Sequence, residues 1–166
     1  YIINRGTLAV GGNYTFVFET DLFSITPRPV TVTADAQSKT YGDADPTFTY
    51  NITTGNKLPT DNFSGALTRA PGQNVGTYAI LEGDLTLGSN YTLTYVGANL
   101  TIGIRSITVT ASAQSKIYGD ADPTLSYTST PDPYYSDVYS GVLSRATGEN
   151  IGTYAIAQNT LALNSN

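Results

Sequence analysis

The sequence predicts an all-β protein, built from small and mainly antiparallel β domains in tandem. Two observations support this prediction: apolar and polar residues alternate with a period of two in short runs, and the sequence repeats at an offset of 77 residues. Residues 28–50 and 105–127 are identical at 17 of 23 positions. In a chain of 166 residues, such a period favours two or three small domains over one large core.

The repeat divides the chain into three segments. The first matches the end of the complete repeat, so we interpret it as the C-terminal part of a preceding repeat. The last begins a further copy and contains no counterpart of residues 91–104, the last strands of the complete repeat. The segments are 1–28 (C-terminal part of a repeat), 29–105 (complete repeat) and 106–166 (repeat lacking its last strands).

About seven short strands are expected in the complete repeat, each with one apolar face and one Thr-rich, solvent-exposed face. This strand number suits an immunoglobulin-like sandwich. Turn residues such as GDADP, PGQNVG and GAN separate the runs. In order, the apolar positions are Val30 and Val32, Phe48 and Tyr50, Ala66 with Arg69 close by, Tyr78 and Ile80, Leu85 and Leu87, the set Tyr91, Leu93 and Tyr95, and the set Leu100, Ile102 and Ile104.

The junctions between repeats are short. Residues 25–32 (ITPRPVTV) and 102–109 (IGIRSITV) lead from one strand directly into the next, without a Gly/Ser linker. Junctions of this kind restrict bending, so we expect an elongated rod in which each domain contacts mainly its neighbours.

Composition argues against several classes of function. Only 13% of residues are charged, the net charge is −5, and no basic run is present, which disfavours binding to nucleic acid or to an anionic membrane surface. No apolar run reaches the roughly 18–20 residues that span a bilayer, so no membrane insertion is expected in this segment. The chain has no Cys, Met, Trp or His. The commonest nucleophiles, bases and transition-metal ligands are therefore missing, and we expect neither an enzyme nor a bound cofactor.

The repeated YGDADP turn is the most conspicuous candidate site. Asp43 and Asp45 lie two residues apart in it, and Asp120 and Asp122 repeat the pattern. Paired carboxylates with nearby carbonyls are candidate ligands for Ca²⁺, which takes six to eight oxygens. The alternative is a tight turn in which the Asp side chains bond to backbone amides.

Basic residues recur beside this turn. Arg69 and Arg145 end the two SGxLxR motifs and are expected to pair with the GDADP acids or to contact a ligand. Lys39 and Lys116 are expected to be exposed or to cap the turn, with a covalent crosslink to Asn or Asp as the alternative.

Three tyrosines are candidates for contact with a partner. Tyr134, Tyr135 and Tyr139 lie in the loop PDPYYSDVYS (131–140), whose counterpart in the complete repeat has the different sequence NKLPTDNF. A loop that differs between otherwise similar repeats is where a binding surface diverges most easily.

Taken together, these motifs resemble the MBG/YDG-type repeats of large bacterial surface and secreted adhesin-like proteins. The motifs are KxYGDADPxxxY at 39–50 and 116–127, SGxLxR at 64–69 and 140–145, GxNxGTYAI at 72–80 and 148–156, and NYTLTYVGANLTI at 90–102. The resemblance implies a β-grasp-like fold as the alternative to the sandwich. It also implies an extracellular or cell-surface location and no catalytic residues.

The expected function is therefore structural or adhesive, as a tandem-repeat segment of a bacterial extracellular stalk or fibre protein. One alternative is a module that binds a surface glycan or a host or matrix protein. Another is a fibre subunit that assembles with copies of itself by strand exchange, because a repeat without its last strands leaves an open sheet edge.

Overall fold

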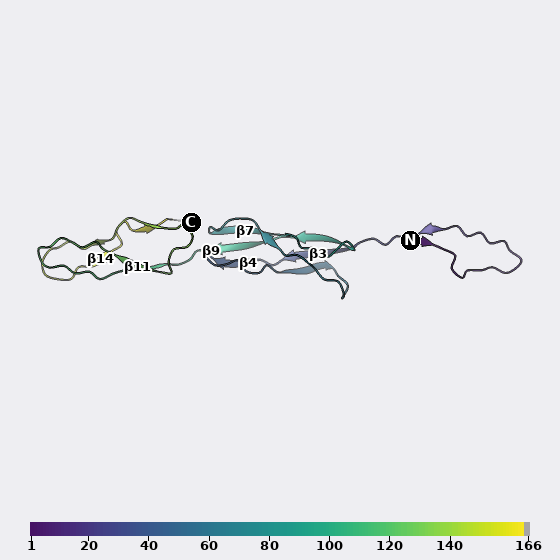
Figure 1. Cartoon of the computed structure of the whole chain (residues 1–166), viewed down its shortest axis with the longest axis horizontal. Helices are drawn as coiled ribbons and strands as arrows, with labels where there is room; N and C mark the ends of the chain where they lie inside the picture. The colour runs from purple at the N-terminus through teal and green to yellow at the C-terminus, as the bar shows by residue number, and fades with distance from the viewer. Residues whose placement is uncertain (165–166) are drawn as a thin grey trace.

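The computed structural model describes residues 1–164, which contain strands and no helix. The all-β prediction is confirmed: the strands form several small sheets, most of them antiparallel. Figure 1 shows an N-terminal hairpin, a middle segment and a C-terminal segment one after another along the longest axis.

The middle segment contains seven strands, the number expected, although a strand forms at residues 37–40 where none was expected and residues 85–87 form only an isolated bridge. They are β3 (Arg28–Ala34), β4 (Gln37–Thr40), β5 (Tyr50–Gly55), β6 (Thr68–Arg69), β7 (Gly76–Leu81), β8 (Tyr91–Val96) and β9 (Ala98–Gly103). One sheet has the order β5-β3-β8, and the other has the order β4-β9-β7-β6.

Two parallel pairs tie the start of the middle segment to its end. β3 pairs with β8, with Arg28 opposite Tyr91, and β4 pairs with β9, with Gln37 opposite Leu100. Both pairs have the same register, so the chain from β3 to β4 runs beside the chain from β8 to β9 through both sheets. Parallel neighbours need a crossover, which the intervening strands β5 to β7 provide.

The core takes its buried side chains from strands of both sheets and from the segments that connect them. In β3 the side chains of Val30 and Val32 are buried while those of Thr31 and Thr33 are partly exposed, and β9 buries Leu100 and Ile102 in the same way. Among residues 1–164, every buried apolar side chain except Leu161 belongs to the middle segment: Val30, Val32, Ala34, Tyr41, Leu67, Ile80, Leu85, Leu87, Leu100 and Ile102.

The C-terminal segment reproduces the pairings of the middle segment that its sequence contains. Its strands are β10 (Thr108–Ala111), β11 (Tyr127–Thr130), β12 (Tyr139–Ser140), β13 (Ser144–Arg145), β14 (Ile156–Ala157) and β15 (Ala162–Leu163). β10 pairs with β11 as β3 does with β5, and β13 pairs with β14 as β6 does with β7. β12 and β15 repeat the Ser64–Thr86 bridge. Within the part of the chain described, β10 pairs with β11 alone.

The N-terminal segment has little regular structure. β1 (Ile2–Ile3) and β2 (Asp21–Leu22) form one short antiparallel pair. Residues 14–19 match β8 in sequence, yet they form no strand, and Tyr14 and Val17 are exposed. In the middle segment the matching strand β8 pairs in parallel with β3, whereas none of the strands described in residues 1–164 pairs with residues 14–19.

Candidate functional site

Four side chains converge on the YGDADP turn of the middle segment. Lys39 comes from β4, Asp45 from the turn, Arg69 from β6 and Tyr78 from β7. Lys39 Nζ lies 2.7 Å from Asp45 Oδ1, and Arg69 Nε lies 2.6 Å from Asp45 Oδ2. The predicted ion pair between Arg69 and the turn is therefore confirmed.

Backbone carbonyls fix the two cations further. Arg69 Nη1 donates to the carbonyls of Ala70, at 2.8 Å, and Gly72, at 2.6 Å. Lys39 Nζ donates to the carbonyl of Asp43, which confirms that it caps the turn. The Lys39 side chain is only 5% exposed and that of Arg69 only 9%, so both cationic side chains are largely buried.

Tyr78 closes the cluster on one side. The Arg69 guanidinium lies 5.3 Å from the centre of the Tyr78 ring, a cation–π distance, and the Tyr78 hydroxyl donates to the carbonyl of Asn74. Gly72 admits this ring, because a Cβ on Gly72 would lie 2.1 Å from it. The motifs around residues 39–50, 64–69 and 72–80 thus meet at one point.

The same cluster of Lys, Asp, Arg and Tyr recurs in the C-terminal segment. Asp122 Oδ1 lies 2.7 Å from Lys116 Nζ, and Asp122 accepts two bonds from Arg145, at 2.8 and 3.0 Å. Arg145 lies over the Tyr154 ring at 5.3 Å. We call each set of Lys, Asp, Arg and Tyr an ionic brace, the first at residues 39, 45, 69 and 78 and the second at residues 116, 122, 145 and 154.

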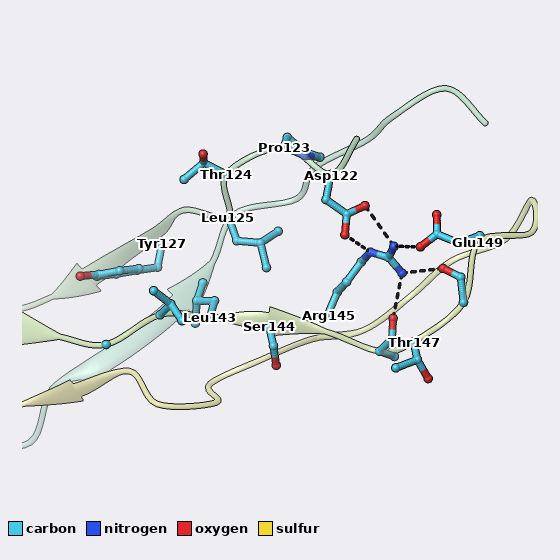
Figure 2. Close-up of a pocket in the computed structure, with 14 residues that line it drawn as sticks. Asp122, Pro123, Thr124, Leu125, Tyr127, Leu143, Ser144, Arg145, Thr147 and Glu149 are labelled. Atoms are coloured by element: carbon cyan, nitrogen blue, oxygen red, sulfur yellow. Dashed lines mark hydrogen bonds and ion pairs between the residues drawn. The ribbon is translucent and has the colours of Figure 1, made fainter. Parts of the chain in front are cut away.

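A second carboxylate joins the second brace. Figure 2 shows the Arg145 guanidinium between Asp122 and Glu149, and Glu149 also accepts from Lys116 at 2.7 Å. The first brace has the neutral Gln73 at this position. Sequence reasoning missed Glu149, although its spacing of four residues from Arg145 was a usable signal.

The pKa shifts show what this arrangement does chemically. Hydrogen bonds from Arg145, then from Lys116, lower the pKa of Asp122 to about 2, and bonds from Arg69 lower the pKa of Asp45. Hydrogen bonding to Asp122 raises the pKa of Lys116. A general acid needs a protonated carboxyl near neutral pH, and a nucleophilic or crosslinking lysine needs a neutral amine. These shifts favour the opposite protonation states, so the brace suits a permanent ion cluster.

The calcium prediction stays a prediction. Asp45 binds Lys39 and Arg69, Asp43 binds Arg105, and Asp122 binds Lys116 and Arg145, so Ca²⁺ would have to displace these cations. The backbone carbonyl of Asp120 accepts from Lys116. Within residues 1–164, no group of three acidic, His or Cys side chains is gathered as a metal site would need.

The three loop tyrosines lie in two different environments. Tyr139 packs against Tyr127 with ring centres 5.2 Å apart, as Phe63 packs against Tyr50 in the middle segment. Tyr134 and Tyr135 instead contact the middle segment. Their contact with a separate partner stays a prediction.

No curated protein and no solved structure matches this chain. In residues 1–164 no helix has both the length and the apolar character needed to cross a membrane. A family model, that of the MBG domain (YGX type), matches residues 30–101 and again residues 107–166. This family is a non-catalytic repeat domain that is typical of large bacterial surface or secreted proteins. The chain therefore belongs to the MBG domain family, YGX type, and contains two copies of its domain.

Proposed function

We propose that this chain is a structural segment of a bacterial extracellular stalk or fibre protein, in which MBG domains in series hold a more distant adhesive part away from the cell. The observation that supports the proposal is the ionic brace, which recurs in both copies with the same partners. Its pKa shifts favour permanent charge over proton transfer. Repetition of a stabilising cluster is what a spacer needs from each domain.

The connection between the copies fits a spacer as well. β9 ends at Gly103 and β10 begins at Thr108, so only residues 104–107 separate the two domains. A connection this short limits the relative motion of its domains, which supports the rod-like arrangement. We place the segment boundaries after residues 28 and 105, of which the second lies between β9 and β10 and the first follows the opening residue of β3. The extracellular location is the one typical of the family.

A binding assay tests the spacer against a ligand-binding module. The purified chain is applied to a glycan array and to immobilised matrix proteins, beside a variant with Ser at positions 134, 135 and 139. A spacer predicts no signal above that of an unrelated protein for either chain. Saturable binding by the natural chain that the variant loses would overturn the spacer and establish the loop as an adhesive site.

Strand exchange between copies is the second candidate function, and one observation favours it. Among residues 1–164, no strand pairs with β10 at the edge where β3 pairs in parallel with β8. Residues 14–18, with the sequence YTFVF, carry the matching alternation and form no strand. Insertion of this stretch beside β10 of another copy would assemble chains head to tail. Light scattering after size exclusion tests it: concentration-dependent oligomers support exchange, and a strict, folded monomer refutes it.

A further inference from the structure

Two tyrosines of the C-terminal segment lie on the YGDADP turn of the middle segment. The Tyr134 ring covers Gly42 so closely that a Cβ on Gly42 would lie 2.5 Å from the ring carbons. Tyr135 meets Tyr41 edge to face, with ring centres 5.4 Å apart at 68°. The Tyr135 hydroxyl is also 3.1 Å from Gln73 Oε1, to which it donates.

Arg105 links the turn to the incoming loop. Its guanidinium lies 4.7 Å from the centre of the Tyr134 ring. The same group donates to the Tyr41 carbonyl and pairs with the Asp43 carboxylate. Arg105 is the last residue of the middle segment, so its cation joins the turn, the linker and the next domain at one point.

The second copy of the turn is exposed, since residues 106–164 provide neither a loop on this turn nor counterparts of β9 and Arg105. Tyr41 is 7% exposed, whereas its counterpart Tyr118 is 70% exposed. Val75 lines the cavity beside Tyr134 and is 39% exposed, whereas its counterpart Ile151 is 94% exposed. A Cβ on Gly119 would meet no atom within 4 Å.

The loop is shaped for this contact more than for its own domain. The counterparts of Tyr134 and Tyr135 in the middle segment are Leu58 and Pro59, so the domain fold does not require aromatic rings there. Tyr135 also has a backbone φ of +55°, which residues other than glycine adopt rarely. Strained residues of this kind persist where surrounding contacts hold them.

We infer that the Tyr41–Gly42 turn and Arg105 form a docking site for the aromatic loop of the domain that follows, and that this contact fixes the orientation of successive MBG domains. The occupant is the loop of the next domain in the same chain, represented here by Tyr134 and Tyr135. The inference deepens the proposed spacer function and rests on it, because a spacer of defined reach needs joints of defined angle.

Distance measurements between paired spin labels test the joint. The chain has no cysteine, so cysteines introduced at the exposed strand positions Thr94 and Thr128 label one domain each. We expect a single narrow distance distribution in the otherwise natural chain. The variant Tyr134→Leu with Tyr135→Gly is expected to broaden it at least twofold, since Leu occupies the first position in the other copy and Gly removes the strain at the second. An equal width in both chains would overturn the inference.

A matched glycine pair keeps the test independent of folding defects. Gly42 and Gly119 have nearly the same φ, +89° and +91°, so alanine strains both backbones equally. Gly42→Ala alone would collide with Tyr134, and we expect it to broaden the distribution while Gly119→Ala leaves it unchanged. Equal effects of the two variants would overturn the docking site.

The joint and the spacer function fail in different ways. A broad distribution in the natural chain, with no ligand on the arrays, would overturn the joint and leave the spacer standing. A narrow distribution together with saturable glycan binding would support the joint and overturn the spacer.

Discussion

Removing Asp45 tests whether the ionic brace stabilises its domain. Asp45→Ala leaves Lys39 and Arg69 facing each other without an anion, and their side chains are only 5% and 9% exposed. Breaking a buried ion pair from one side costs about 3–5 kcal/mol. Asp45 itself is 35% exposed, so water screens part of this interaction, and we expect a loss of about 2 kcal/mol in the free energy of unfolding.

The second brace supplies the matched control. Asp122→Ala leaves Glu149 in place, which pairs with both Lys116 and Arg145. We therefore expect a clearly smaller loss of stability from this variant than from Asp45→Ala. The first brace has no second carboxylate, because Gln73 is the counterpart of Glu149. The substitution Gln73→Glu is therefore expected to restore part of the stability lost with Asp45→Ala.

Urea titration and thermal unfolding, followed by circular dichroism, measure these changes. For a domain of this size, a loss of about 2 kcal/mol lowers the melting temperature by roughly 8–16 °C. The reasoning is refuted if Asp45→Ala and Asp122→Ala destabilise equally, or if Gln73→Glu gives no rescue. It is also refuted if Asp45→Ala leaves the unfolding transition where it was.

Three further predictions follow from the same geometry. Leu100→Ala removes a fully buried side chain from β9 and should cost about 2–5 kcal/mol of unfolding free energy in urea titrations. The pKa of Asp122 is lowered from 3.8 to about 2, so its stabilisation should be present above about pH 4 and be lost as the pH falls through about 2. Acid titrations of Asp122→Asn should lack this share of the loss and keep the share of Asp45 and Glu149, whose pKa values are also lowered. Gly72→Ala, whose Cβ would collide with Tyr78, should lower the melting temperature more than Gly88→Ala, which has positive φ and open space.

Local patterns predicted the features that one strand or one turn determines. The alternation at Val30 and Val32 identified which face of β3 is buried, because successive side chains of a strand point to opposite faces. The same alternation cannot tell in which direction a partner strand runs, so the parallel pairing of β3 with β8 was not predicted. The polar sequence of β4 was missed as well, since pairing with β9 decides its conformation. Leu85 and Leu87 are buried as expected. They do not lie in a strand, however, because Thr86 forms only an isolated bridge with Ser64.

The candidate site was predicted in part for a related reason. Arg69 and the acids of the turn occur at equivalent positions in both repeats, which indicated them as candidates, and Arg69 does pair with Asp45. Lys39 was expected to cap the turn, yet its burial depends on strands that are distant in the sequence. The position of Tyr134 on Gly42 was beyond sequence reasoning, because that contact joins two separate domains.

Small-angle X-ray scattering from the purified chain tests the central claim, that MBG domains in series form an extended spacer. One compact domain of 166 residues would have a radius of gyration of about 15 Å. Two domains of one repeat length, each with a radius of gyration of about 11–12 Å, give about 19 Å or more when placed end to end. We predict a value above about 19 Å with the scattering signature of a folded chain. A folded particle near about 15 Å would contradict the account.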